Sequence, residues 1–187
     1  MSDKLTILGI CGSLRQSSFN AAALRVAQSL VPANVTLNIY QGLETIPPFN
    51  QDQENQLPSS VVELKKQISA ADAILFVTPE YNYSVPGVLK NAIDWASRPY
   101  GASAWEGKPA AIMGASIGMV GTARAQYHLR QTMVFLNMFP LNRPEVMIPL
   151  AADKFDASGN LTDDKTRDKI GELMVALVAW AQRLEKK

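Results

Sequence analysis

Residues 5–11 read LTILGIC, an almost unbroken apolar run with β-branched side chains that ends at Gly12-Ser13. Such a run is typical of a strand that is covered on both faces of a sheet. After the polar residues 14–18, apolar side chains recur at the spacing of one helix face: Ala23, Val26, Ala27 and Leu30. The stretch therefore predicts a strand, a loop and a helix.

The same unit recurs twice further along the chain. Residues 73–77 (AILFV) predict a second buried strand, after which Pro86 can begin a helix. Residues 109–115 (PAAIMGA) predict a third strand, which a glycine-containing loop and a helix over about 122–135 follow. Three strand-loop-helix units indicate a repeated crossover topology.

Two outer strands and two further helices complete the pattern. Residues 35–40 (VTLNIY) alternate as a half-buried strand does, and residues 146–150 predict the last strand. A helix with Val61, Leu64 and Ile68 on one face begins near Ser59 or Ser60, either of which is a suitable cap. The chain ends in a long amphipathic helix, for which Thr162-Asp163-Asp164 is the expected capping region.

Strands that alternate with helices imply an open parallel sheet with helices on both faces, because the crossovers are right-handed. The strand-loop-helix units do not repeat one another in sequence, and no low-complexity segment or interdomain linker interrupts the pattern. We therefore expect an α/β chain with a three-layer α/β/α architecture and a five-stranded parallel sheet, formed as a single domain by residues 1–187.

Composition excludes several classes of partner. The 187 residues are 47% apolar and carry a formal net charge of only +1, which argues against nucleic acid as a partner. Cys11 is the single cysteine, so no intramolecular disulfide forms, and no Cys/His spacing indicates a metal site. Because the apolar run 5–11 is too short for a membrane span and no cleavage site follows it, we expect a cytoplasmic protein.

In such a sheet, ligands bind beyond the carboxyl ends of the strands, where the strand order reverses. The first loop, residues 12–20, carries the side chains of Ser13, Arg15 and Ser18 immediately before a helix. A helix N-terminus offers unpaired N–H groups and a positive dipole end, and a guanidinium adds a charge-assisted contact. The loop thus predicts a phosphate site, although an ordinary strand-to-helix turn with good capping residues would contain the same residue types.

The second and third loops offer different groups. Residues 78–87 combine stiffening prolines with Tyr81, Tyr83 and the amide of Asn82, which suit the wall and edge of a planar ring. Simple packing or a subunit contact would explain an aromatic loop equally well. The third loop supplies Ser116 and two glycines, small residues that let a ligand approach the backbone closely.

These motifs together resemble a known family. The segments G-S-L-R-x-x-S-F-N at 12–20 and P-E-Y-N-Y-S-V-P-G-V-L-K-N-A-I-D-W at 79–95 are similar to the NADPH-dependent FMN reductase family, in particular its bacterial quinone and chromate reductase branch. The similarity extends through residues 97–99 and 105–109 to 124–127, and thus covers most of the chain. The C-terminal helix adds similarity only at the level of the fold.

The resemblance implies a flavodoxin-like fold with strand order 2-1-3-4-5 and a bound FMN. It assigns the phosphate and ribityl end to Ser13, Arg15, Ser18, Phe19 and Asn20, the isoalloxazine to Pro79, Glu80, Tyr81, Asn82 and Tyr83, and the closing of the site to Ser116 and Gly118. Members of the branch form homodimers and homotetramers, and the resemblance places four residues at polar intersubunit contacts: Tyr83, Arg124, Tyr127 and Glu145. The same four would also serve as surface residues without a partner.

The activity that the resemblance implies is transfer of hydride from NADH or NADPH through FMN to a quinone, with chromate, other metal ions or azo compounds as side substrates. The flavin carries the chemistry, so we expect no covalent catalytic residue and no metal. A flavodoxin-like electron carrier is an alternative, but such carriers usually dock through an acidic surface that a net charge of +1 does not supply. A free-flavin reductase or an azoreductase remains a further alternative.

Overall fold

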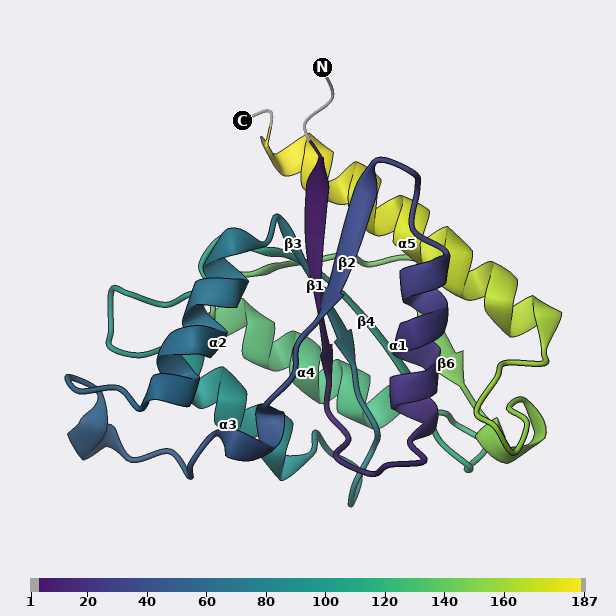
Figure 1. Cartoon of the computed structure of the whole chain (residues 1–187), viewed down its shortest axis with the longest axis horizontal. Helices are drawn as coiled ribbons and strands as arrows, with labels where there is room; N and C mark the ends of the chain where they lie inside the picture. Colours follow the sequence, from purple (N-terminus) through teal and green to yellow (C-terminus); the bar gives the residue numbers. More distant parts are fainter. Residues whose placement is uncertain (1–3, 186–187) are drawn as a thin grey trace.

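The computed structural model describes residues 4–185, which form one sheet between two layers of helices (Figure 1). The strands are β1 (Leu5–Cys11), β2 (Val35–Ile39), β3 (Ala73–Val77), β4 (Pro109–Ala115), β5 (Phe139–Pro140) and β6 (Val146–Ile148). The helices are α1 (Phe19–Ser29), α2 (Ser59–Ala70), α3 (Gly87–Ala96), α4 (Ala123–Phe135) and α5 (Asp164–Glu185), with short 3₁₀ turns at Leu43–Thr45, Gln51–Gln53 and Ala151–Asp153.

The sheet has the strand order β2-β1-β3-β4-β5, and every pairing is parallel. This confirms the expected three-layer architecture and the order 2-1-3-4-5. The number of strands differs from the expected five, because β6 pairs with β4 on the same side as β5. The fifth position is therefore filled by two short strands, one at each end of β4.

The division of the fifth position has a local cause. Phe139 pairs with Pro109 at the start of β4, whereas Val146 pairs with Met113 near its end. Pro144 lies in the interruption and has no N–H to donate to a ladder. The predicted strand 146–150 is also shorter than expected, because Leu150 adopts a left-handed backbone with φ of 49°.

Each face of the sheet has its own core. Alternation along β1 sends Ile7 toward the core beneath α1 and α5, and Leu8 toward the core beneath α2, α3 and α4. The same alternation holds along β3, where Leu75 and Phe76 belong to opposite cores. The central strands are thus covered on both faces, as their continuous apolar sequences predict.

The helix termini agree with the sequence in one case and differ in another. Asp163 Oδ2 accepts a hydrogen bond from the Thr166 N–H at 2.8 Å, which confirms the capping region of α5, and the bonds to Thr166 lower the pKa of Asp163. Capping of α2 by Ser59 or Ser60 is wrong. Pro58 occupies that position and its carbonyl accepts from the following turn, while the Ser60 hydroxyl donates to Thr45 O.

The register brings three loops to one edge of the sheet. Cys11 at the end of β1 lies opposite Val77 at the end of β3, which in turn lies opposite Met113 of β4. The loops that follow these strands therefore emerge side by side, at the lower edge in Figure 1. Within residues 4–185, no helix combines the length and apolar character that crossing a membrane requires.

Candidate functional site

The first loop places hydroxyls and a guanidinium at the start of α1. Ser18 is the N-cap of the helix, and its hydroxyl oxygen accepts from the Ala21 N–H at 3.2 Å. Arg15 folds over the loop, with Nε donating to Ser17 O at 3.2 Å and the guanidinium 5.4 Å from the centre of the Phe19 ring. A positive group and a helix N-terminus thus share one location, which is the arrangement that favours a phosphate.

The second loop is a tight two-residue turn. Tyr81 and Ser84 exchange backbone hydrogen bonds of 3.1 and 2.9 Å, and the residues between them have positive φ, 50° at Asn82 and 65° at Tyr83. This geometry is that of a type I′ turn, which non-glycine residues adopt only when their surroundings support it. The Nδ1 atom of His128, exposed on α4, lies 3.1 Å from Ser84 Oγ and so contacts the turn.

Glu80 fastens the second loop to α4. Its side chain is only 5% exposed, forms an ion pair with Arg124, and accepts from the backbone N–H groups of Arg124 and Ala125 at 3.0 and 3.2 Å. The Arg124 guanidinium in turn lies 3.5 Å from the centre of the Tyr83 ring. The carboxylate therefore caps the helix and holds the turn, a role that places its charge toward α4.

The third loop is joined to the first by Asn20. The buried amide of Asn20 donates to Ala115 O at 2.9 Å and accepts from Ala115 N–H at 2.8 Å, which fixes the start of α1 against the end of β4. Ser116 Oγ donates to Gly121 O and accepts from the Gly118 N–H, so this side chain shapes its own loop. Gly121 has a φ of 61°, which favours glycine there.

The three loops enclose a cavity of about 220 Å³. Most of the residues that the sequence assigned to a ligand line this cavity, whereas Asn82, Tyr83 and Gly118 lie outside its lining. Ala115 and Ile117 also line it and were not expected. The lining residues are Ser13, Arg15, Ser18, Phe19, Asn20, Pro79, Glu80, Tyr81, Ala115, Ser116 and Ile117.

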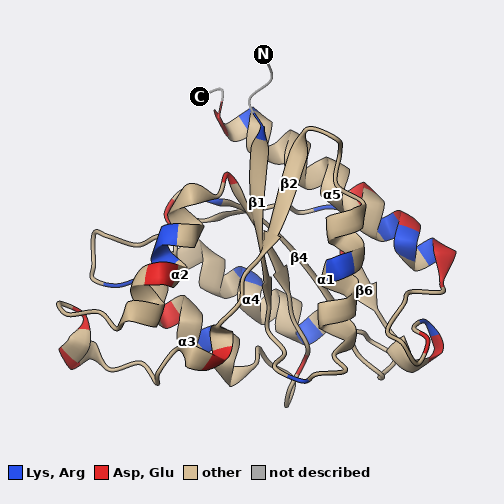
Figure 2. Ribbon diagram, viewed as in Figure 1, with Lys and Arg blue, Asp and Glu red and all other residues tan. Residues whose placement is uncertain are grey.

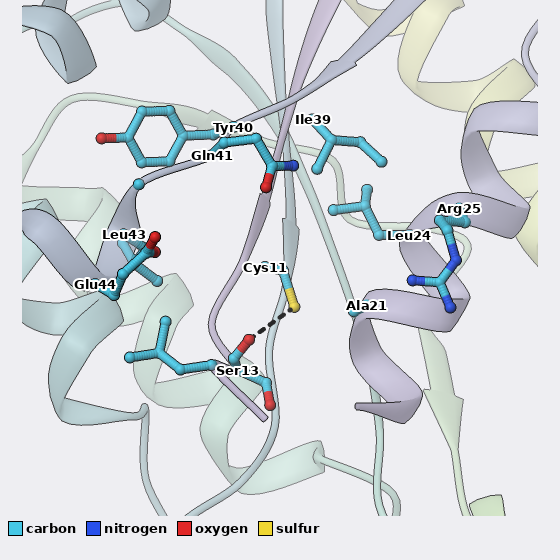
Figure 3. A pocket seen from close by; sticks show the side chains of 12 residues that line it. Cys11, Ser13, Ala21, Leu24, Arg25, Ile39, Tyr40, Gln41, Leu43 and Glu44 are labelled. Carbon is cyan, nitrogen blue, oxygen red and sulfur yellow. Dashed lines mark hydrogen bonds between the residues drawn. The ribbon is translucent and has the colours of Figure 1, made fainter. Parts of the chain in front are cut away.

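A larger cavity of about 480 Å³ lies on the other side of the first loop (Figure 3). It is bounded by the end of β1, by α1 and by the residues after β2, and it touches neither the second nor the third loop. Cys11 faces it, and its Sγ donates to Ser13 O at 3.6 Å. Burial raises the pKa of the Cys11 thiol and so disfavours the reactive thiolate. The smaller cavity, at which all three loops meet, is the better candidate site.

Two of the polar side chains at the site also bind the protein itself. The Glu80 carboxylate binds the start of α4, and the Asn20 amide binds the end of β4. The partners lie 44 and 95 residues away in the sequence, so no local pattern indicates them. Within residues 4–185, no group of three or more His, Cys, Asp or Glu side chains is placed to hold a metal ion.

Comparison with known proteins finds relatives that match this chain over most of its length. The family model described as NADPH-dependent FMN reductase matches residues 5–153, which include all three loops. An NAD(P)H-dependent FMN reductase of Pseudomonas aeruginosa is 55% identical over 185 residues, covering 98% of this chain and 99% of that protein. A quinone reductase of Escherichia coli K12 is 42% identical over 188 residues, covering 99% of this chain and all of that protein.

A solved structure is similar as well. The flavoenzyme NAD(P)H:acceptor oxidoreductase of Paracoccus denitrificans superposes with a TM-score of 0.87 at 38% identity, over 96% of this chain and 98% of its own. The family model spans residues 5–153, which contain all three loops and every strand of the sheet. The chain therefore belongs to the NADPH-dependent FMN reductase family.

Proposed function

We propose that this protein is an FMN-dependent NAD(P)H oxidoreductase that transfers two electrons to quinones. The observation that carries the proposal is the cavity at the meeting point of the three loops, which the hydroxyl and guanidinium groups of the first loop line together with Pro79 and Tyr81 of the second. The names of the relatives support the acceptor, since they include a quinone reductase and a 2-hydroxy-1,4-benzoquinone reductase. We also propose that residues 1–187 form one domain and act in the cytoplasm.

The residues present fit an FMN. At the first loop, the hydroxyls of Ser13 and Ser18 and the guanidinium of Arg15 stand beside the α1 N-terminus, a donor set suited to a phosphate dianion. Phe19 lines the cavity beside them, and the hydrogen bond from the Asn20 amide to Ala115 O holds this loop against the end of β4. We propose that these five residues hold the phosphate and ribityl end.

The other end of the cavity suits a flat ring. Pro79 and Tyr81 provide a rigid wall, and the turn at Asn82 and Tyr83 projects beside it. Glu80 positions this wall through α4, while Ser116 and Gly118 shape the closing loop. We propose that these seven residues form the isoalloxazine side of the site.

The mechanism requires little of the protein beyond placement. When bound, FMN supplies the two-electron chemistry by accepting hydride from reduced nicotinamide and passing it to the acceptor. Pro79 and Tyr81 would hold the flavin ring on one side and so leave its other side to the donor and the acceptor in turn. The cavity is partly open to solvent, so a planar acceptor can reach it. We propose chromate and azo compounds as side substrates.

The visible absorption spectrum tests this function directly. The purified protein is expected to retain or take up FMN, and anaerobic NADH or NADPH is expected to bleach its flavin absorption. Steady-state turnover with a benzoquinone should then exceed turnover with free FMN as acceptor. A protein that binds no flavin would contradict the proposal, a flavin that NAD(P)H does not reduce would favour an electron carrier, and preferential turnover of free FMN would favour a free-flavin reductase.

Replacement of Arg15 by alanine is expected to raise the Kd for FMN about tenfold or more, because a charge-assisted contact to the phosphate is lost. Turnover at saturating FMN should recover, since Arg15 acts by binding. Quenching of free FMN fluorescence during titration measures the affinity. Arg183→Ala, which removes an exposed guanidinium from the last turn of α5, is the matched control and should bind as the wild type does. Unchanged affinity in Arg15→Ala would refute the phosphate assignment.

We further propose that the protein forms a homodimer or homotetramer in which Tyr83, Arg124, Tyr127 and Glu145 contribute to the interface. Two observations support this. Tyr83 and Tyr127 are 66% and 52% exposed, and Tyr127 Oη lies 3.4 Å from Glu145 Oε2. Exposed aromatic groups with polar tips are common at protein interfaces.

Removal of the Tyr127 hydroxyl by Tyr127→Phe is expected to shift the protein toward a smaller oligomer, because the phenol loses its polar contacts. Sedimentation velocity over a range of protein concentrations measures the shift. Tyr100→Phe alters a tyrosine of similar exposure outside the proposed interface and should leave the species unchanged. The same distribution of species in the wild type and Tyr127→Phe would exclude a contribution of this hydroxyl to assembly.

A further inference from the structure

A cavity of about 410 Å³, which we name the second cavity, adjoins the proposed flavin cavity and is distinct from the cavity of Figure 3. The two share Arg15, Ser18 and Phe19, so the start of the first loop and of α1 forms a common wall. Its opposite wall is the segment after β6, from Ala152 to Gly159, which curls beside the first loop and α1 in Figure 1. Apart from Arg15, Ser18 and Phe19, none of the proposed FMN contacts lines this cavity.

The floor of this second cavity is apolar and aromatic. Phe19 and Phe155 pack with ring centres 5.5 Å apart and an interplanar angle of 37°, and Ala22 lines the cavity beside them. Phe155 is buried, which fixes the ring in place. A flat heterocycle of the size of adenine would find a rigid apolar surface here.

The rim of the same cavity carries an uncommitted cation. Arg25 projects from α1 as the only basic residue of that helix, visible as the blue band on α1 in Figure 2. Its guanidinium lies at the rim between this cavity and that of Figure 3, and Arg25 forms neither a hydrogen bond nor an ion pair with any residue in the range 4–185. Arg15, by contrast, is already assigned to the FMN phosphate.

The one carboxylate at the rim does not compete for Arg25. Asp156 accepts hydrogen bonds from the backbone N–H groups of Ser158 and Asn160, at 2.9 and 2.8 Å, and from the Asn160 amide at 2.9 Å. The bonds from Asn160 lower the pKa of Asp156, as expected for a carboxylate surrounded by donors. The free guanidinium therefore remains available to an anionic group that enters the cavity.

We propose that this second cavity binds the phosphorylated adenosine end of NAD(P)H, with adenine on Phe19 and Phe155 and a phosphate on Arg25. The inference rests on the proposed function, because the nicotinamide must reach the flavin cavity next door. The two cavities share the wall at the phosphate end of the flavin cavity, so the proposal requires the dinucleotide to run past that end to the ring side of the same cavity. Two phosphate sources fit Arg25: the 2′-phosphate of NADPH and the diphosphate that both dinucleotides carry.

Isothermal titration calorimetry on the FMN-loaded protein tests the inference without turnover. The probes are adenosine 2′,5′-bisphosphate and adenosine 5′-diphosphate, neither of which contains nicotinamide. Both are expected to bind the wild type, and Arg25→Ala should weaken at least one of them about tenfold, as loss of a charge-assisted hydrogen bond implies. Arg25→Lys should retain part of the affinity because the charge remains. Arg183→Ala is again the control and should match the wild type.

The two probes distinguish the sources of the phosphate. A loss confined to the 2′,5′-bisphosphate assigns Arg25 to the 2′-phosphate. Arg25→Ala should then raise the KM for NADPH more than the KM for NADH, relative to the wild type, and should retain kcat. An equal loss for both probes assigns Arg25 to a phosphate at the 5′ position. Wild-type affinity in Arg25→Ala, or release of FMN by either probe, would overturn the inference.

Failure of this inference can be told apart from failure of the function. Bleaching of the flavin by NADPH reports only on the flavin cavity, and it is measured on the same preparation. If the flavin bleaches and the probes do not bind, the adenosine site is wrong and the oxidoreductase stands. If the protein binds no flavin, the proposed function itself fails.

Discussion

Gly114→Ala is expected to lower the free energy of unfolding by about 3 kcal/mol, near the upper end of the range for overpacking a dense core. A Cβ at this position of β4 would lie 2.1 Å from Thr122 Oγ1 and 2.2 Å from the backbone oxygen of Thr78. Rotation of Thr122 cannot relieve the second contact, because backbone must move. The strand would have to shift away from the residues that begin the second loop and α4. Urea denaturation measures the loss.

The same substitution is expected to weaken FMN binding, since both displaced segments border the site. Gly171→Ala in α5 is the matched control: a Cβ there meets nothing within 4 Å. Because alanine is the better helix former, that variant should gain about 0.5–1 kcal/mol in stability and bind FMN normally. Wild-type stability in Gly114→Ala would mean that the close packing of β4 against Thr78 does not exist in solution.

Glu80→Ala is expected to reduce stability by about 1–3 kcal/mol and to raise the Kd for FMN, because it removes a helix cap and releases the second loop together. The N–H groups of Arg124 and Ala125 would lose their acceptor. Arg124 could still lie over the Tyr83 ring, but its guanidinium would lose the ion pair with Glu80 that holds it there. Denaturant unfolding and FMN titration measure the two effects.

One further variant separates the ion pair of Glu80 from its helix cap, and a second variant is a control. Arg124→Ala removes the ion pair but leaves both backbone N–H groups capped, so it should cost less than Glu80→Ala. Glu63→Ala breaks an exposed ion pair with Lys66, whose atoms are 3.9 Å apart, and should change stability by less than about 1 kcal/mol. Equal losses in Glu80→Ala and Glu63→Ala would show that Glu80 neither caps α4 nor holds the loop.

The sheet was largely predictable because its signals are local. The strands at 5–11, 73–77 and 109–115 have the bounds that their apolar runs indicate, since a strand covered on both faces needs apolar residues at every position. The fifth position was not predictable in detail. β5 has only two residues and includes Pro140, so no periodicity marks it, and it is defined only by its pairing with β4.

The sequence indicated which loops line the candidate site, but it did not indicate which protein groups their side chains bind. The loops that carry Ser13, Tyr81 and Ser116 meet at one cavity, because the ends of adjacent parallel strands share an edge. The tasks of Glu80 and Asn20 depend on partners in α4 and β4, which sequence spacing does not reveal. The turn at Tyr83 was equally hidden, since an aromatic residue rarely adopts positive φ.

The sequence by itself determined the layer architecture, the strand order that follows from the family resemblance, and the three loops that form the site. Those properties follow from short-range patterns of apolar, turn and capping residues. Only the tertiary structure decided that Glu80 serves α4, and that Arg25 remains free beside the aromatic pair of Phe19 and Phe155. The physical reason is that hydrogen bonds, ion pairs and cavities depend on distances between atoms that folding alone brings together.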